Sequence, residues 1–187
     1  MVYAIIVCAV VFLLMAIVLY NTLIRRKNDV ENAFASIDAM LKKRYDLIPA
    51  IVDAVKGYMN YEKDLLTKIT SLRVRALSQN LSNEERIIIE NEIMKGLSDI
   101  TVAVENYPDL KANQNFLHLQ GTLNEVEEQL AASRRAFNAA VTAYNNSVEV
   151  FPTNIMASMM NYKRRTLFNI PADDRDKVST RPFGNIG

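Results

Sequence analysis

The sequence has little of what most catalytic and metal-binding sites are made from. Of its 187 residues one is cysteine, one is histidine and none is tryptophan. The single cysteine, Cys8, allows no intramolecular disulfide, no thiolate zinc cage and no Cys-x-x-Cys redox pair. The single histidine, His118, lacks the two Glu-x-x-His motifs that a di-iron bundle requires. We therefore expect no metal, no cofactor and no enzymatic activity.

The sequence also has almost no excess of charge of either sign and few residues that break helices. The chain has 22 Lys and Arg against 21 Asp and Glu, so its formal net charge of +1 creates no general field that would attract nucleic acid. Five glycines and five prolines leave room for long helices, and no strand pattern of useful length is present. A hydrophobic content of 50% is enough for a packed core. The composition predicts an all-α protein that does not bind nucleic acid.

What the chain does have is a long uncharged run, residues 2–19, which predicts a transmembrane helix. At 1.5 Å per residue the run covers about 27 Å, and continuation to Ile24 gives about 34 Å, enough to cross a bilayer. Tyr3 and Tyr20 lie at its two ends, where amphipathic rings favour the headgroup layer. A cleaved signal peptide would begin with a basic residue and end in small residues, and this run does neither. We expect an uncleaved single-pass anchor over residues 1–24.

The basic cluster Arg25-Arg26-Lys27 follows this run directly. Loops on the cytoplasmic side of a membrane carry an excess of Lys and Arg. The cluster therefore predicts an N-terminus outside and a C-terminal domain in the cytoplasm.

The next stretch, residues 25–78, carries apolar residues at alternating steps of three and four, the spacing of one buried helical stripe. The stripe comprises Val30, Phe34, Ile37, Leu41, Tyr45, Ile48, Val52, Val55 and Met59. Charged residues between them, such as Arg44, are expected to face solvent, and Pro49 to kink the helix without ending it. One rod of about 80 Å would leave half of the stripe uncovered and require self-association. A turn near Gly57 would instead give four antiparallel helices.

Two more helices are expected downstream. The stretch Gln79-Asn80-Leu81 is expected to end the preceding helix, and Ser82 with Glu85 forms a capping box before an isoleucine-rich helix. The longest helix then extends from about Ala112 to Val150 and ends at Pro152.

Two Tyr-Asn pairs lie far apart in the sequence, Tyr20-Asn21 and Tyr144-Asn145, and an antiparallel fold would bring them to similar depth. They predict either a polar recognition patch or asparagines that set helix register by hydrogen bonding. The longest helix is also rich in asparagine, a poor helix former, which indicates a buried hydrogen-bonded ladder or a polar partner. Its asparagines are Asn113, Asn115, Asn124, Asn138, Asn145 and Asn146. The carboxylates of Glu62 and of Glu125–Glu128 have no paired base or nucleophile and are expected at the surface.

These residues resemble the signatures of the LemA family. The resemblance rests on Tyr20-Asn21, the stretch Leu41-Lys42-Lys43-Arg44-Tyr45-Asp46-Leu47-Ile48-Pro49, Leu110-Lys111-Ala112-Asn113 with Asn115-Phe116, and Tyr144-Asn145 with Phe151-Pro152. It implies an N-terminal membrane helix and an up-and-down four-helix bundle, which favours the turn near Gly57. It implies no accepted enzymatic activity. Tyr61 stands where the family often has histidine before Glu62, which argues against a metal site there.

The expected organisation is a transmembrane anchor (1–24), a LemA-like helical bundle of coiled-coil type (25–151), a short amphipathic segment (152–170) and a tail (171–187). Within the third of these, Asn154 is expected to cap a helix that reaches Phe168.

The leading functional hypothesis is a membrane-anchored scaffold that binds protein partners and other copies of itself and contributes to membrane or envelope organisation. The alternative is an accessory or regulatory subunit of a membrane peptidase or another membrane enzyme. The candidate interaction or register residues are Tyr20, Asn21, Arg44, Tyr45, Asp46, Pro49, Asn113, Asn115, Tyr144 and Asn145.

Overall fold

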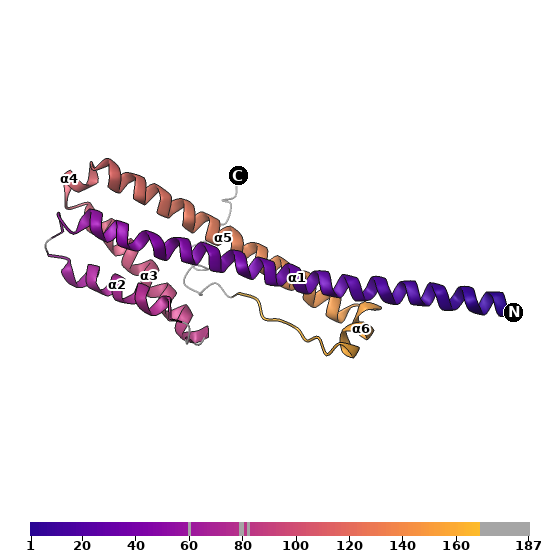
Figure 1. The fold of residues 1–187 in the computed structure, drawn as a ribbon. Coiled ribbons are helices and arrows are strands. Elements are labelled where there is room, and N and C mark those ends of the chain that lie inside the picture. The colour runs from indigo at the N-terminus through magenta and orange to yellow at the C-terminus, as the bar shows by residue number, and fades with distance from the viewer. Residues whose placement is uncertain (60, 79–80, 82, 169–187) are drawn as a thin grey trace, which may run out of the picture. The chain divides into compact units, whose positions relative to one another are not determined.

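The computed structural model describes residues 1–59, 61–78, 81 and 83–168, and within these ranges it contains helices and no strand, as the composition predicts. The helices are α1 (Val2–Val55), α2 (Lys63–Ala76), α3 (Asn83–Val104), α4 (Pro108–Lys111), α5 (Gln114–Glu149) and α6 (Thr153–Met159) (Figure 1). The chain forms two compact units. Unit 1 comprises Met1–Phe34 and Arg134–Gly187, and unit 2 comprises Ala35–Ser133.

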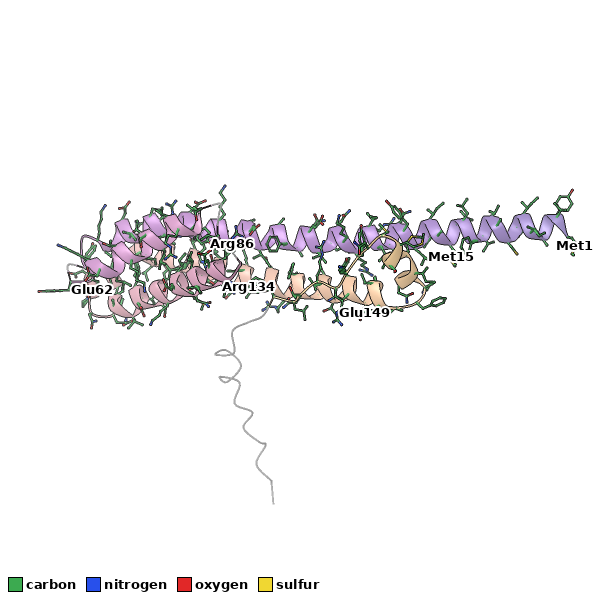
Figure 2. The ribbon with its side chains drawn as sticks, turned by 90° about the horizontal axis from the view of Figure 1, so that it is seen from below. Met1, Met15, Glu62, Arg86, Arg134 and Glu149 are labelled. Carbon is green, nitrogen blue, oxygen red and sulfur yellow. The ribbon has the colours of Figure 1, made fainter. Side chains whose placement is uncertain are left out.

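Helix α1 continues without a break from the apolar run into the polar part of the chain. All side chains from Met1 to Met15 are exposed, and Figure 2 shows them projecting outward with no other described segment beside them. The first fully buried side chain is Leu23, at the end of the expected anchor. This part of α1 is long and apolar enough to cross a membrane. The helix also continues through Pro49, as expected, because Pro49 is exposed and removes only one backbone donor.

The chain turns after α1 and does not form a rod. Residues 56–58, which include Gly57, form a turn, and α2 begins at Lys63. The Nε of Arg73 in α2 donates a hydrogen bond of 2.8 Å to the carbonyl oxygen of Tyr45 in α1, so the two helices pack antiparallel. The stripe on α1 therefore has partners within the chain, and its length alone no longer requires self-association.

The core of unit 2 consists of apolar side chains from α1, α2, α3, α4 and α5. Helix α3 ends at Val104, and Asn113 caps α5 because its Oδ1 accepts hydrogen bonds from the backbone N–H groups of Asn115 and Phe116, at 2.9 and 3.2 Å. Residues 79–80, the capping residue Ser82 and the tail 171–187 lie outside the described residues.

In unit 1, α5 lies antiparallel to α1 in a defined register. The rings of Phe34 and Phe137 are 5.9 Å apart, and Val30 packs in one cluster with Val141 and Tyr144, so a step of seven from Phe34 places residue 27 level with Tyr144. One more step of seven places Tyr20 level with Phe151. The prediction that Tyr20-Asn21 and Tyr144-Asn145 lie at similar depth is therefore wrong by about 10 Å, seven residues of helix.

The segment after α5 also differs from expectation. Asn154 lies inside α6 and does not cap it, and α6 ends at Met159 instead of Phe168. Residues 162–168, which we call the strap, are non-helical. They leave the helical path because side chains of α5 supply the hydrogen bonds that further helical turns would have made, as described below.

Candidate functional site

A buried arginine, Arg44, connects three helices of unit 2. Its side chain is 1% exposed and forms ion pairs with Glu90 of α3 and with Glu127 of α5, the latter at 3.0 Å. The hydroxyl of the neighbouring Tyr45 donates a hydrogen bond to the same Glu90. The expectation that Arg44 faces solvent is therefore wrong, whereas Glu127 remains partly exposed.

The burial of Arg44 follows from the number of helices that contact α1. Arg44 shares a row with Ile48, Ile51 and Val55, which follow it by four, seven and eleven residues and are all buried. Because α2, α3 and α5 all pack on α1 in unit 2, its buried face is wider than a single stripe. A charge inside that face is tolerated only when it is paired, which explains the two glutamates. Because the cluster joins α1, α3 and α5 through one buried cation, we interpret it as a structural connector.

The turns of unit 2 are held by a second polar cluster. The Tyr107 hydroxyl donates a 2.8 Å hydrogen bond to Glu62, and Asn113 Nδ2 lies 3.4 Å from the Tyr58 hydroxyl oxygen. The hydrogen bond to Glu62 raises the pKa of Tyr107, because it favours the protonated phenol. Glu62 is thus partly enclosed and has a role in the fold, whereas its neighbour Tyr61 is 93% exposed.

Two asparagines of α5 hold the strap in unit 1. Asn145 Nδ2 donates to the carbonyl oxygen of Arg165, and its Oδ1 accepts from the Arg165 N–H, both at 2.9 Å. Asn138 makes the same pair of bonds with Phe168, at 3.1 and 2.8 Å. Seven residues of helix and three residues of drawn-out chain both span about 10 Å, so the two spacings match. Each side-chain amide therefore supplies the donor and the acceptor that the backbone of a neighbouring β-strand would supply.

The aromatic and cationic side chains of the strap reinforce this attachment. The guanidinium of Arg165 lies 5.2 Å from the Tyr144 ring centroid, and the Tyr162 and Tyr144 rings are 6.3 Å apart. Burial raises the pKa of the Tyr144 hydroxyl, although the positive charges of Arg165 and Lys27 oppose this shift.

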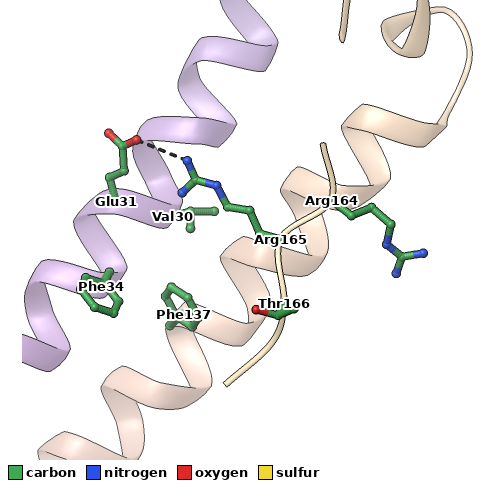
Figure 3. Close-up of a pocket in the computed structure, with 7 residues that line it drawn as sticks. All are labelled: Val30, Glu31, Phe34, Phe137, Arg164, Arg165 and Thr166. Carbon is green, nitrogen blue, oxygen red and sulfur yellow. Dashed lines mark hydrogen bonds and ion pairs between the residues drawn. The ribbon is translucent and has the colours of Figure 1, made fainter. Parts of the chain in front are cut away.

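An open groove of about 490 Å³ lies between α1, α5 and the strap. Its walls are Val30, Glu31, Phe34, Phe137, Arg164, Arg165 and Thr166 (Figure 3). Glu31 and Arg165 form an ion pair of 3.4 Å across one wall, while the two phenylalanine rings supply the apolar wall. An apolar wall beside an ion pair suits packing or the binding of a partly apolar group.

The sequence-predicted residues fall into five separate places. Arg44 and Tyr45 belong to the buried ion cluster, whereas Asp46 and Pro49 are exposed on the same helix, with Asp46 4.0 Å from Arg73. Asn113 and Asn115 form the start of α5, Tyr144 and Asn145 hold the strap, and Tyr20 and Asn21 are exposed on α1.

Three participants were missed at the sequence level: Glu90, Arg165 and Phe168. The spacing of seven between Asn138 and Asn145 was visible, and it was one sign of the hydrogen-bonded ladder. Its partner was not recognisable because the strap was expected to be helical.

Fold and site together define a membrane-associated helical protein with a single N-terminal anchoring helix, in which polar clusters join the helices. The LemA family model matches residues 33–181. The chain therefore belongs to the LemA family. In the described part of the chain, no cluster of three or more His, Cys, Asp or Glu residues could hold a metal ion.

The relatives agree with this family. Protein LemA of Metamycoplasma hominis is 27% identical over 165 residues, which cover 88% of this chain and 75% of the relative. Magnetosome protein MamQ 2 of Paramagnetospirillum magneticum is 22% identical over 203 residues, with 95% and 75% covered. Magnetosome protein MamQ of Magnetospirillum gryphiswaldense is 19% identical over the same length and coverage. None of these three is named as an enzyme.

Removal of the buried cation should destabilise unit 2. In Arg44→Met, Glu90 and Glu127 lose their counter-charge inside the fold, and we expect a loss of about 3 kcal/mol in the free energy of unfolding. The exposed neighbour provides a matched control, Lys43→Met, which should change stability by less than about 0.5 kcal/mol. Urea unfolding of the full chain in detergent measures both. Equal midpoints for the two variants would contradict the connector role.

Release of the strap should expose its basic residues to protease. In Asn145→Ala the two hydrogen bonds to Arg165 are lost, about 1 kcal/mol each, so trypsin cleavage at residues 163–165 should be faster by roughly 10- to 30-fold. The control Asn146→Ala removes an exposed amide at the next position of α5 and should leave the cleavage rate unchanged. Fragment masses over a time course report the rates, and indistinguishable rates would show that the amide does not hold the strap.

Proposed function

We propose that this chain is a membrane-anchored scaffold whose α3 associates with a second copy of the chain, and that such assemblies contribute to membrane or envelope organisation. The observation that carries the proposal is that α3 is apolar on its inner and its outer side. Its inner side contributes Ile89, Ile93 and Ile100 to the core of unit 2, where each is at most 1% exposed.

The outward side of α3 has no reason to be apolar in an isolated chain. Ile87, Met94 and Val102 are 50%, 49% and 66% exposed and recur at steps of seven and eight. Exposed Asn91 and Ser98 complete this surface, which we call the outer stripe, and both are uncharged. Apolar side chains that line up along the exposed side of a helix mark an interaction site.

A second copy of the same chain fits the outer stripe best. Steps of seven and eight are the spacing at which helices pack side by side, and a stripe without charges can face itself across a two-fold axis without repulsion. Anchoring by α1 confines copies to one plane, which raises their effective concentration.

The proposal includes the orientation of the protein. The cluster Arg25-Arg26-Lys27 favours a cytoplasmic location for the helical domain. The relatives named as magnetosome proteins carry the name of a cellular structure and not of a reaction, which supports an organising role.

Charge on the outer stripe should disrupt the assembly and leave the fold intact. In Met94→Glu an exposed apolar side chain becomes charged, so we expect the full chain in mild detergent to change from an oligomer to a monomer. The control Asn124→Glu adds the same charge at an exposed position of α5 and should remain oligomeric. Light scattering across a concentration series measures the mass, and circular dichroism confirms the helix content.

Two results would overturn the proposal. One is a wild-type chain that stays monomeric at the highest concentration, and the other is an oligomer that persists in Met94→Glu. Crosslinking from position 94 to a single membrane enzyme in place of a second copy would replace it with the accessory-subunit hypothesis.

A further inference from the structure

Unit 1 carries a second group of exposed apolar side chains, where α5 meets α6. Val150, Phe151, Ile155 and Met159 are 58%, 74%, 55% and 78% exposed. Ile155 and Met159 lie one turn apart on α6, so they project from the same side of that helix. We call these four residues the α5–α6 corner. It is separate from the outer stripe of α3, which belongs to unit 2.

The corner lies beside the end of the membrane-spanning run. The register that pairs Phe34 with Phe137 and Val30 with Val141 places Phe151 level with Tyr20. Tyr20 is the aromatic residue that ends the uncharged run. In both views α6 lies alongside α1 on the N-terminal side of the packed part of unit 1 (Figures 1 and 2). The corner is thus at the depth at which the bilayer surface meets unit 1.

The surroundings of the corner are basic. Between residues 20 and 31 and between 149 and 165, the basic side chains are Arg25, Arg26, Lys27, Lys163, Arg164 and Arg165, and the acidic ones are Asp29, Glu31 and Glu149. The acidic side chains pair with Arg26, Lys27, Arg164 and Arg165. Among the described residues, the exposed Arg25 and Lys163 form no ion pair, so their charges are available to a ligand.

Exposed apolar side chains bordered by Lys and Arg are the pattern of segments that lie in a membrane interface. The apolar groups enter the boundary between headgroups and acyl chains, and the cations attract anionic headgroups. Aromatic residues such as Tyr20 and Phe151 at one depth fit the same layer.

We propose that the α5–α6 corner docks into the bilayer next to α1 and binds anionic phospholipid. Phe151, Ile155 and Met159 enter the interface, and Arg25 and Lys163 contact lipid phosphates. The corner then provides a second membrane attachment besides α1. This attachment prevents unit 1, which includes the membrane helix, from rotating freely about the membrane normal.

Depth-dependent fluorescence quenching tests the proposal on the full chain in vesicles. In a Cys8→Ser background, Ile155→Cys carries an environment-sensitive dye, and lipids with a nitroxide near the headgroup act as quenchers. The matched position is Ala136→Cys, which is exposed on α5 and lies fifteen residues before Phe151, about 22 Å at the rise of a helix. In vesicles of phosphatidylglycerol and phosphatidylcholine, quenching at 155 should exceed quenching at 136 several-fold.

The anionic lipid is tested in the same assay. Vesicles of phosphatidylcholine alone should weaken quenching at 155, and so should Lys163→Glu in the mixed vesicles, whereas the control Arg135→Glu should not. Equally weak quenching at 155 and 136 would overturn the docking. If quenching at 155 is the same in both kinds of vesicle and is unchanged by Lys163→Glu, the binding of anionic lipid is overturned. A dye at 155 that is shielded from water but not quenched would assign the corner to a second copy of the chain, and this too would overturn the proposal.

Discussion

Helix α1 must satisfy two environments, and the rest of the structure depends on how it does so. Inside a bilayer every backbone group needs a partner within the segment, which only an uninterrupted helix supplies. The same helix continues to Val55 and becomes the surface on which both units are built. Leu23 is its first fully buried side chain, after a run from Met1 to Met15 in which every side chain is exposed. The end of the apolar run therefore sets where packing by α5, α6 and the strap can begin.

Polar side chains then specify which helix lies where. Apolar stripes of similar spacing tolerate shifts by one heptad, since such a shift exchanges one apolar pair for another. Arg44 tolerates no such shift, because a shifted α3 or α5 would leave a buried charge without Glu90 or Glu127. Asn138 and Asn145 have the same effect on the strap, because each amide matches one backbone position. In this protein the buried polar residues determine which segments pack together, and the apolar residues supply the buried apolar surface.

The sequence predicted most of the architecture, because the periodicity of apolar residues in a helix and the residues that end a helix are local signals. The anchor and the end of α5 before Pro152 follow from residues close by in the chain. The turn near Gly57 was one of two layouts that the apolar stripe left open, and the family resemblance favoured it. Arg44 was misplaced because its burial depends on how many helices surround α1, which a single stripe does not reveal. The strap was mistaken for helix because its hydrogen bonds come from Asn138 and Asn145. These residues lie 30 and 20 positions before their partners in the chain. The two Tyr-Asn pairs were placed at similar depth because an antiparallel fold was expected, but aromatic and apolar packing sets a register that offsets them.

The central claim is the register of α1 against α5 in unit 1, since it places the strap, the groove and the α5–α6 corner. Crosslinking of cysteine pairs with a short dimaleimide, in the full chain with Cys8→Ser and in vesicles, tests it most directly. The register predicts efficient intramolecular crosslinks for Phe34→Cys with Phe137→Cys and for Tyr20→Cys with Phe151→Cys, and none for Phe34→Cys with Phe151→Cys. A crosslink in the last pair, or its absence in the first two, would contradict the account.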